Sequence, residues 1–257
     1  MKKFALFLLL FSAACTETET KSADVIAEIP NEGNEVVMLP FHKMLDSAGL
    51  DGSILIFTKG NLFSNDFEWA KTGHLPASTY KIPNSIIALE LGIMENDSTM
   101  IYWDGEPRYM KSWEQDLFFR DAFHLSCVPC YQEIARKIGT ERMKQFTDDF
   151  NYGNMVFDST TVDEFWLGGE SVISQVEQID FLQRFMEGAL PISKRTQALM
   201  QQMMIIEETK DYTFRGKTGW SIQNEVNNCW FVGVVESNGE THYFATNIEP
   251  KEGTDVS

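Results

Sequence analysis

The sequence predicts an α+β fold in which an antiparallel β-sheet is flanked by helices and carries an inserted helical lobe. Strand-like apolar patterns occur near the start of the chain and again at its end, whereas helical periodicity dominates the middle. When both ends of a chain form one sheet, the middle must pack on that sheet or beside it. No internal repeat or second linker divides the 257 residues, so we expect one large domain.

The first 14 residues have the parts of a secretory signal peptide. Lys2 and Lys3 precede an apolar run at residues 4–11, and small residues follow. The run is too short to remain as a membrane span. The small residues before Cys15 resemble the cleavage site of bacterial lipoproteins, so we expect lipid on Cys15; ordinary cleavage and an uncleaved segment are the alternatives. Each of the three exports the chain, to the periplasm, and lipid is the only membrane attachment expected.

Residues 15–35 are rich in Thr, Glu and Asn and lack a sustained period, which predicts a flexible tether before a domain at residues 36–257. The formal net charge is -17, and clusters of Lys and Arg are missing. This composition argues against nucleic acid or an anionic membrane face as a partner. The four His show no metal-ligand spacing, so no metal is expected.

The elements of the expected domain can be assigned in order along the chain. Apolar patterns predict two strands around a turn at Lys59-Gly60, at residues 53–57 and 61–69. Helical periodicity predicts helices at residues 79–91, around 112–123, and at 129–138, 140–149, 175–187 and 194–204. Strands return at residues 212–215, 220–222, 229–236 and 242–248, with a hairpin turn at 237–239.

Three cysteines lie in the expected domain: Cys127, Cys130 and Cys229. Thiols usually pair in an oxidising compartment, but an odd number remains if Cys15 carries lipid. We expect buried free thiols, with a local disulfide between Cys127 and Cys130 as the alternative. The Cys-x-x-Cys spacing also occurs in redox enzymes, yet here it does not follow a strand of a βαβ unit, so redox function is not expected.

The stretch Ser78-Thr79-Tyr80-Lys81 places a hydroxyl and an amine three residues apart at an expected helix start. Residues at this spacing share a face of a helix, so Lys81 could act as a base toward Ser78. Because a lysine in water has a pKa of about 10.4, it must be buried or chemically altered to act near neutrality. The alternative is a capped helix with an exposed lysine. The apolar residues that follow, such as Ile86 and Leu89, favour burial.

Three further short stretches contain candidate site residues. Ser126-Cys127-Val128 begins an expected helix, Tyr152-Gly153-Asn154 has the composition of a turn, and Lys217-Thr218-Gly219 precedes Trp220 near a strand. Taken singly, each has an ordinary structural explanation: a helix N-cap at Ser126, a turn, and a strand edge. In the functional interpretation, Gly219 would let a substrate lie against the strand.

The order and separation of these stretches are more specific than any one of them. A Ser-x-x-Lys, a Ser-x-x element and a Lys-Thr-Gly on a late strand occur in this order in penicillin-recognising serine enzymes. From about Val36 onward, the chain resembles the class D β-lactamases, or oxacillinases. The resemblance rests on residues 76–85, 126–135, 152–154, 165–167 and 216–221.

The resemblance implies a chemical role for several matching residues. Ser78 would be the acylated nucleophile. Lys81 would be carboxylated on its amine by carbon dioxide or bicarbonate, which would make it an anionic base, and no other cofactor is implied. Trp166 would hydrogen-bond this carbamate, while Val128 and Leu167 would keep its pocket apolar.

The other matching residues would act on the substrate or support the site. Ser126 would pass a proton to the lactam nitrogen as the ring opens. Lys217 and Thr218 would face the substrate carboxylate, and the backbone N–H groups of Ser78 and Trp220 would form an oxyanion hole. Three residues would be structural supports: Tyr152, Gly153 and Asn154.

The implied function is hydrolysis of β-lactam antibiotics, such as penicillins and oxacillin-type compounds, and hence antibiotic resistance. The alternatives are a non-hydrolysing penicillin-binding or sensor domain and an inactive lipoprotein of the same fold. The family continues into a terminal helix, preceded by an Arg that helps to bind the substrate carboxylate. This chain has no Arg after Arg215 and stops at Ser257, so we expect a C-terminally truncated domain.

Overall fold

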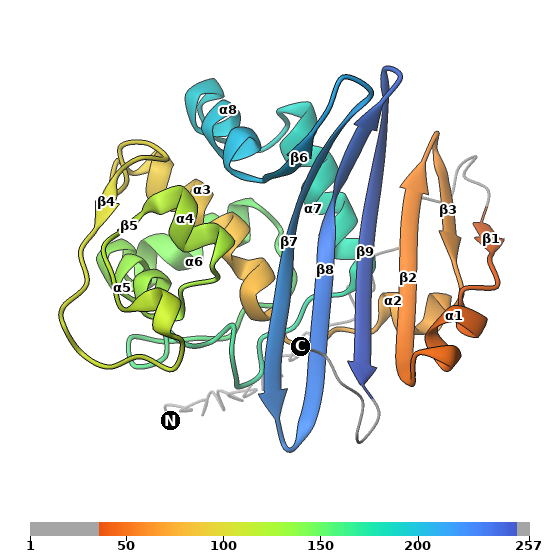
Figure 1. Cartoon of the computed structure of the whole chain (residues 1–257), viewed down its shortest axis with the longest axis horizontal. Coiled ribbons are helices and arrows are strands. Elements are labelled where there is room, and N and C mark those ends of the chain that lie inside the picture. The colour runs from red at the N-terminus through yellow and green to blue at the C-terminus, as the bar shows by residue number, and fades with distance from the viewer. Residues whose placement is uncertain (1–35, 251–257) are drawn as a thin grey trace, which may run out of the picture.

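The computed structural model describes residues 36–250 of the chain. The predicted signal peptide, Cys15 and the predicted tether lie outside the described residues, as do residues 251–257. Across the described part, no helix is both long and apolar enough to cross a membrane. A seven-stranded sheet with a helical lobe beside it makes up the fold (Figure 1).

The sheet joins strands from both ends of the described chain, in the order β1-β3-β2-β9-β8-β7-β6. These strands are β1 (Val36–Met38), β2 (Leu50–Thr58), β3 (Asn61–Ser64), β6 (Ile205–Glu208), β7 (Tyr212–Gln223), β8 (Val226–Ser237) and β9 (Glu240–Pro250). The pairing of β2 with β9 confirms that the two ends share one sheet. β1 runs parallel to β3 while the other neighbours are antiparallel, so the sheet is mixed.

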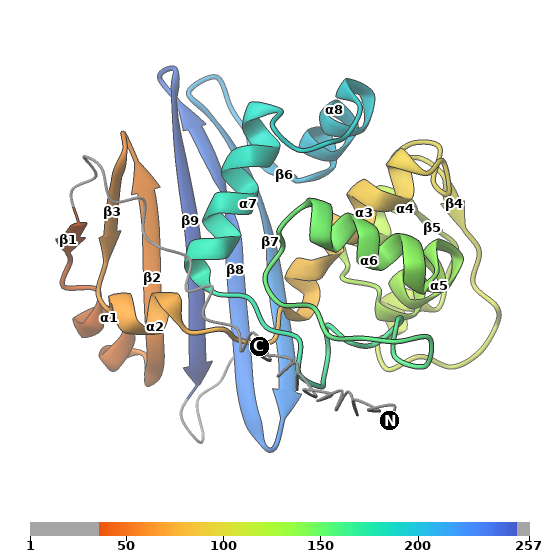
Figure 2. The same cartoon turned by 180° about the vertical axis from the view of Figure 1, so that it is seen from behind.

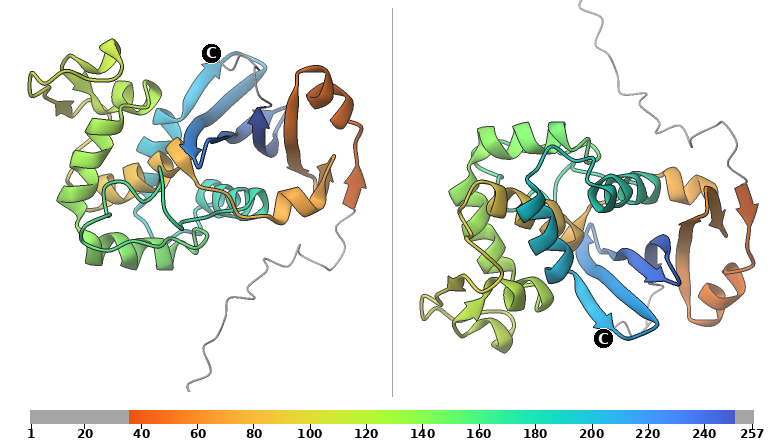
Figure 3. Two further views of the ribbon diagram at one scale, coloured as in Figure 1. Left: turned by 90° about the horizontal axis from the view of Figure 1, so that it is seen from below. Right: turned by 90° about the horizontal axis from the view of Figure 1, so that it is seen from above.

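Helices lie on both faces of the sheet. Figure 2 shows α7 (Gln175–Glu187) and α2 (Phe67–Lys71) on one face, and α1 (His42–Ser47) lies on the other side of β2. The two views in Figure 3 separate these layers. Because side chains alternate along a strand, Val232 and Ala245 are fully buried on one face, whereas Phe231 and Phe244 meet edge to face on the other.

The helical lobe lies beside the β7 edge of the sheet (Figure 1). It contains α3 (Lys81–Glu90), α4 (Phe119–His124), α5 (Val128–Ile138), α6 (Thr140–Asp149) and a ribbon of β4 (Met100–Ile101) with β5 (Leu117–Phe118). α8 (Lys194–Met203) packs against α3 and leads into β6. Large side chains with no exposed surface, including Tyr80, Phe119 and Tyr131, fill the lobe and fix its position against the sheet.

Capping signals explain the helix ends that the sequence predicts correctly. α7 spans the predicted residues 175–187. At its start, the Ser174 hydroxyl accepts from the Glu177 N–H, and the Glu177 carboxylate accepts from the Ser174 N–H. At its end, Gly188 takes a left-handed φ of 73°. α6 also has its predicted bounds, which confirms the assignment of the helical middle.

The predicted strand at residues 61–69 is wrong in its second half. β3 ends at Ser64, and α2 follows almost at once. The Asp66 carboxylate caps this helix, because it accepts hydrogen bonds of 3.0 and 2.9 Å from the N–H groups of Glu68 and Trp69. A helix of five residues is too short to show a period.

Two other predicted elements differ from the structure. The helix expected around residues 112–123 is a 3-10 turn (Lys111–Trp113), then β5, then α4. The strands expected at residues 212–215 and 220–222 are one strand, β7. Glycines interrupt its apolar pattern, and Gly216 is required there because a Cβ would lie 2.9 Å from the Val232 carbonyl oxygen.

Candidate active site

Ser78 and Lys81 meet where the lobe adjoins β7. A 3-10 turn (Ala77–Tyr80) runs directly into α3, so the helix predicted at residues 79–91 begins as a tighter turn. Lys81 Nζ donates a hydrogen bond of 2.9 Å to Ser78 Oγ. The two residues are only 1% and 6% exposed, which confirms the prediction that Lys81 is buried.

The surroundings of Lys81 favour its neutral amine. Burial, followed by the positive charge of Lys217, holds the pKa of Lys81 well below the usual lysine value. The ring of Tyr131 lies 5.1 Å from Lys81 Nζ, and the Tyr131 hydroxyl is 2.7 Å from Ser85 Oγ, which ties α5 to α3. A neutral amine can accept a proton from a nearby hydroxyl or react with an electrophile.

Trp166 contributes a buried donor that has no partner among the described residues. Its indole Nε1 is buried and makes no hydrogen bond. The ring stacks on Tyr80 at 5.5 Å between centroids and meets Phe165 edge-on at 5.2 Å. Tyr80 directly precedes Lys81 in the chain. An indole N–H can only donate, and leaving it unpaired is costly, so this site is suited to an acceptor that the protein itself does not provide.

Ser126 lies before α5 and does not cap it. Cys127 occupies the N-cap position, so the ordinary explanation of Ser126 as a helix cap is wrong. Lys217 Nζ donates hydrogen bonds to Ser126 Oγ and, at 3.0 Å, to the Thr218 carbonyl oxygen. Burial lowers the pKa of Lys217 to about 8. A hydroxyl in contact with such an ammonium group is well suited to pass on a proton.

Gly219 allows β7 to approach the turn that carries Ser78. A Cβ at position 219 would lie 3.2 Å from Ala77 Cβ and from the Ser78 backbone nitrogen, which is tighter than ordinary van der Waals contact. On either side, Thr218 is exposed and Trp220 is 51% exposed. The Trp220 indole donates to Asn227 Oδ1 at 2.9 Å, so this ring is held against the neighbouring strand β8.

These groups border one open cleft of about 550 Å³. The structure brings together in its lining six of the predicted site residues, namely Ser78, Ser126, Val128, Thr218, Gly219 and Trp220. Lys81 and Lys217 are buried beside this lining, in contact with Ser78 and Ser126. The cleft therefore has two serine hydroxyls in its lining and a buried lysine amine in contact with each of them.

Sequence reasoning missed several residues of the cleft. They are mostly large and apolar: Tyr109, Met110, Trp113, Leu125, Cys229 and Trp230. Tyr109 is 91% exposed and Met110 is 45% exposed, although both are large. The available signal was a group of aromatic residues in a segment without helical or strand period, because exposed apolar groups of this kind mark binding surfaces.

Tyr152, Gly153 and Asn154 lie outside the cleft lining, and the Tyr152 hydroxyl is 3.5 Å from Oγ1 of Thr79, the residue after Ser78. The Tyr152 hydroxyl donates to Gln178 Oε1 at 3.2 Å, which links this turn to α7. Gly153 has a φ of 59°, and a Cβ there would lie 2.5 Å from the Val172 carbonyl oxygen. The Asn154 N–H donates to that same carbonyl at 2.9 Å. The three residues thus clamp the two ends of the loop that carries Trp166.

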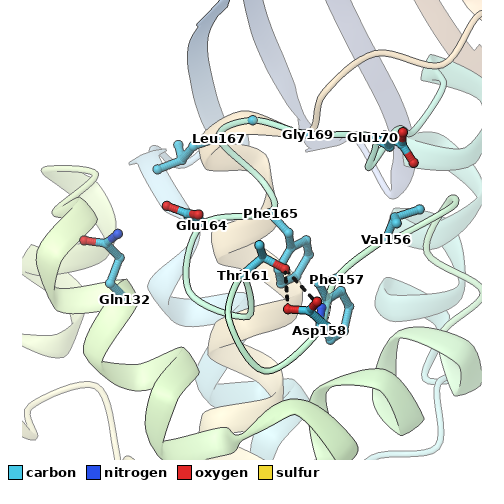
Figure 4. Close-up of a pocket in the computed structure, with 11 residues that line it drawn as sticks. Gln132, Val156, Phe157, Asp158, Thr161, Glu164, Phe165, Leu167, Gly169 and Glu170 are labelled. Atoms are coloured by element: carbon cyan, nitrogen blue, oxygen red, sulfur yellow. Dashed lines mark hydrogen bonds between the residues drawn. The ribbon is translucent and has the colours of Figure 1, made fainter.

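That loop also borders a larger cavity of about 740 Å³, which contains neither Ser78 nor Lys81. Figure 4 shows Phe165 beside Phe157, with which it stacks at 4.2 Å, and Asp158 hydrogen-bonded to Thr161. Leu167 lines this cavity and not the cleft. Across residues 36–250, no group of three or more His, Cys, Asp or Glu side chains is placed to hold a metal ion.

The expectation of free thiols at Cys127 and Cys130 is wrong. The two residues form a disulfide, with 5.4 Å between their Cα atoms. Position 127 is the N-cap of α5 and position 130 lies in its first turn, so the helix brings the two sulfurs together. Cys229 keeps a free thiol, as expected, and lines the cleft.

The chain is similar to families that carry this kind of site. Residues 53–257 match the model of the penicillin binding protein transpeptidase domain. The chain is 41% identical over 189 residues to beta-lactamase OXA-10 of Pseudomonas aeruginosa, which covers 72% of this chain and 71% of that protein. It is 33% identical over 254 residues to beta-lactamase OXA-5 of the same organism, covering 97% of this chain and 90% of that protein.

A solved structure shows the same relationship. The class D beta-lactamase YbXI from Nostoc superposes with a TM-score of 0.80 at 41% sequence identity, covering 83% of this chain and 90% of that chain. The mixed sheet, the flanking helices and the lobe beside β7 are therefore an arrangement that this protein has in common with a solved relative.

Proposed function

The chain belongs to the class D β-lactamase family and is a serine β-lactamase that hydrolyses β-lactams, and we propose that catalysis proceeds through an acyl-enzyme on Ser78 with Lys81 as the basic residue. The observation that carries this proposal is the buried contact of 2.9 Å between Lys81 Nζ and Ser78 Oγ. Burial keeps the amine neutral, as its carboxylation to an anionic base requires, and the contact puts Lys81 within reach of the proton that must leave Ser78.

Acylation of Ser78 opens the β-lactam ring. Ser78 Oγ attacks the lactam carbonyl carbon, a C–O bond forms, and the C–N bond breaks. The departing nitrogen takes a proton from Ser126, whose hydroxyl is resupplied by Lys217 through their hydrogen bond. The backbone N–H groups of Ser78 and Trp220 are the proposed oxyanion hole, and Gly219 supports this assignment because it lets β7 approach the Ser78 nitrogen closely.

The substrate carboxylate is assigned to Lys217 and Thr218. A buried ammonium group attracts an anion more strongly than an exposed one, because fewer water molecules screen it. Lys217 is 3% exposed and lies beside the residues that line the cleft. Thr218 is exposed and is one of those lining residues. Large apolar side chains, including Tyr109 and Trp113, would contact the rest of the substrate.

Carboxylation of Lys81 by carbon dioxide is part of the proposal, and it would supply an anionic general base for the water that releases the acyl group. Two features of this site support it. The lowered pKa of Lys81 provides the neutral amine that carbon dioxide requires. The unpaired Trp166 indole N–H is a donor suited to an anionic oxygen. Val128, in the cleft lining, would keep water scarce nearby, whereas Leu167 lines the separate cavity and is not part of this proposal.

The proposed enzyme is exported to the periplasm and held at a membrane by lipid on Cys15. The support for this is the charged start, apolar run and small residues before Cys15. In a bacterial host, Cys15→Ser should move the protein from the membrane fraction to the soluble periplasmic fraction. Retention of the variant in the membrane fraction would exclude lipid on Cys15 as the anchor.

Pre-steady-state kinetics with a chromogenic cephalosporin test the proposed function. Sustained turnover is expected from the wild type and none from Ser78→Ala, because the variant has no nucleophile. Ser237→Ala, at the exposed hairpin between β8 and β9, is the matched control and should retain full turnover. A burst of one equivalent without turnover would instead identify a penicillin-binding sensor domain, and no reaction at all would identify an inactive lipoprotein of this fold.

A further inference from the structure

Ser126 has a backbone conformation that serine disfavours. Its φ is +53°, in the left-handed region. Its N–H donates to the Phe123 carbonyl at 3.1 Å, and the Cys127 N–H donates to the Ala122 carbonyl at 2.9 Å. Together with the C-cap at Leu125, this is the pattern of bonds that closes a helix through a glycine at the position after the cap. Here a serine occupies the glycine position.

A left-handed serine needs support from its surroundings. The conformation costs about 1–2 kcal/mol, and such residues persist where neighbouring structure holds them. On one side of Ser126, the Trp113 indole donates to the Leu125 carbonyl at 3.0 Å. On the other side, Cys127 is both the last residue of the α4 closure and the N-cap of α5. One residue therefore sets the chain direction for two helices.

The disulfide fixes Cys127, the residue after Ser126, covalently. Cys127 is bonded to Cys130 in the first turn of α5, and the two residues are 1% and 8% exposed. The rest of α5 is anchored independently, because Tyr131 packs in the core and its hydroxyl contacts Ser85 on α3. The disulfide therefore ties the peptide after Ser126 to a helix that is itself held in place.

We propose that the Cys127–Cys130 disulfide is a positioning element for catalysis, which holds Ser126 in its left-handed conformation with Oγ on Lys217 Nζ. This inference rests on the proposed function, in which Ser126 protonates the lactam nitrogen. The disulfide then serves acylation more than deacylation, to which residues 126–130 contribute only the apolar side chain of Val128. Ser78 and Lys81 lie on the turn before α3 and on α3 itself, and their contact does not pass through residues 126–130.

The double variant Cys127→Ser/Cys130→Ser removes the covalent bond but leaves an oxygen at the N-cap, where serine is a preferred residue. The rate constant of acylation and kcat/KM should fall about 10- to 100-fold, since misplacing a proton donor by about 1 Å has effects of this size. The rate constant of deacylation should change by less than about twofold. Loss of acylation and deacylation by equal factors would mean general damage to the fold and would overturn the proposal.

Reduction of the folded wild type gives a second measurement that does not depend on the variant folding. Dithiothreitol converts the disulfide to two thiols, and acylation should slow by a factor similar to that in the variant. The double variant, which retains Cys229, should not respond to dithiothreitol, so it controls for effects on the free thiol. Acylation within twofold of the wild type in the reduced enzyme, or in a folded double variant, would overturn the proposal.

The outcomes separate this inference from the proposed function. A wild type that never becomes acylated contradicts the Ser78 mechanism whatever the disulfide does. A wild type that acylates normally and is insensitive to loss of the disulfide leaves the Ser78 mechanism intact and removes the positioning role alone.

Discussion

Lys217 Nζ donates a hydrogen bond to Ser126 Oγ across 91 positions of sequence. Lys217 is buried in the middle of β7 and Ser126 lies in the turn between α4 and α5, so the contact joins the sheet to the lobe beside the cleft. In the proposed mechanism, this single contact combines two tasks, because Lys217 both attracts the substrate carboxylate and resupplies the proton that Ser126 donates.

Lys217→Ala should lower kcat/KM about 10- to 100-fold, because a hydrogen bond to a charged group contributes roughly 1.5–3 kcal/mol. Steady-state kinetics with a penicillin would measure the loss. Lys210→Ala removes the same charge from the exposed turn before β7 and should leave kcat/KM within twofold. Equal effects of the two substitutions would show that only the overall charge matters.

The affinity for substrate should also fall as the pH becomes alkaline. The pKa of Lys217 is lowered to about 8 by burial, so the group is charged below pH 8 and becomes neutral above it. The ammonium group that attracts the carboxylate is therefore lost as pH rises through 8, and KM should increase. A pH profile of KM from 6 to 10 checks this, and a flat profile across that range would contradict the role of Lys217.

Trp166→Phe should slow deacylation more than acylation. The substitution removes the indole N–H but keeps an aromatic ring to stack on Tyr80. If the N–H stabilises carboxylated Lys81, activity of the variant should depend more steeply on added bicarbonate than that of the wild type. Because carbon dioxide reacts with the neutral amine, activity should also fall in acid, bicarbonate-depleted buffer and recover when bicarbonate is added.

Single-turnover kinetics across a bicarbonate series would measure both steps. Trp166→Ala, which removes the ring as well, should have an effect at least as large as Trp166→Phe. Activity that is indifferent to bicarbonate in the wild type and in both variants would show that Lys81 acts as a plain amine.

Gly153→Ala should destabilise the domain by about 1–3 kcal/mol, because the new Cβ would meet the Val172 carbonyl oxygen in a left-handed backbone conformation. Gly92→Ala is the matched control, since its φ of 67° is similar but nothing lies within 4 Å of the added Cβ. Denaturant unfolding of the two variants separates the clash from the backbone cost. Equal destabilisation would show that the close approach to Val172 is not needed.

Much of the fold could be predicted because local signals and tertiary packing agree. The capping box at Ser174 and the left-handed Gly188 mark the ends of α7 in the sequence itself. The helix predicted around residues 112–123 is wrong because the segment consists of three elements that are each too short to show a period.

The sequence predicts which residues form the active site, but it does not predict all of their positions and conformations. Ser78 and Lys81 are one helical turn apart, so their contact follows from spacing. The left-handed conformation of Ser126 could not be predicted, because glycine is the usual residue there. The disulfide is not predicted because an odd number of cysteines favours free thiols, whereas the first turn of α5 places Cys127 next to Cys130.

Ser78 is the residue proposed to attack the β-lactam. Mass spectrometry of the protein after exposure to a slowly released β-lactam, followed by proteolysis, tests it directly. One adduct is expected, with the mass of the intact opened β-lactam, on the peptide that contains Ser78, and no adduct is expected on Ser78→Ala. An adduct on any other peptide, or one that persists in Ser78→Ala, would contradict it.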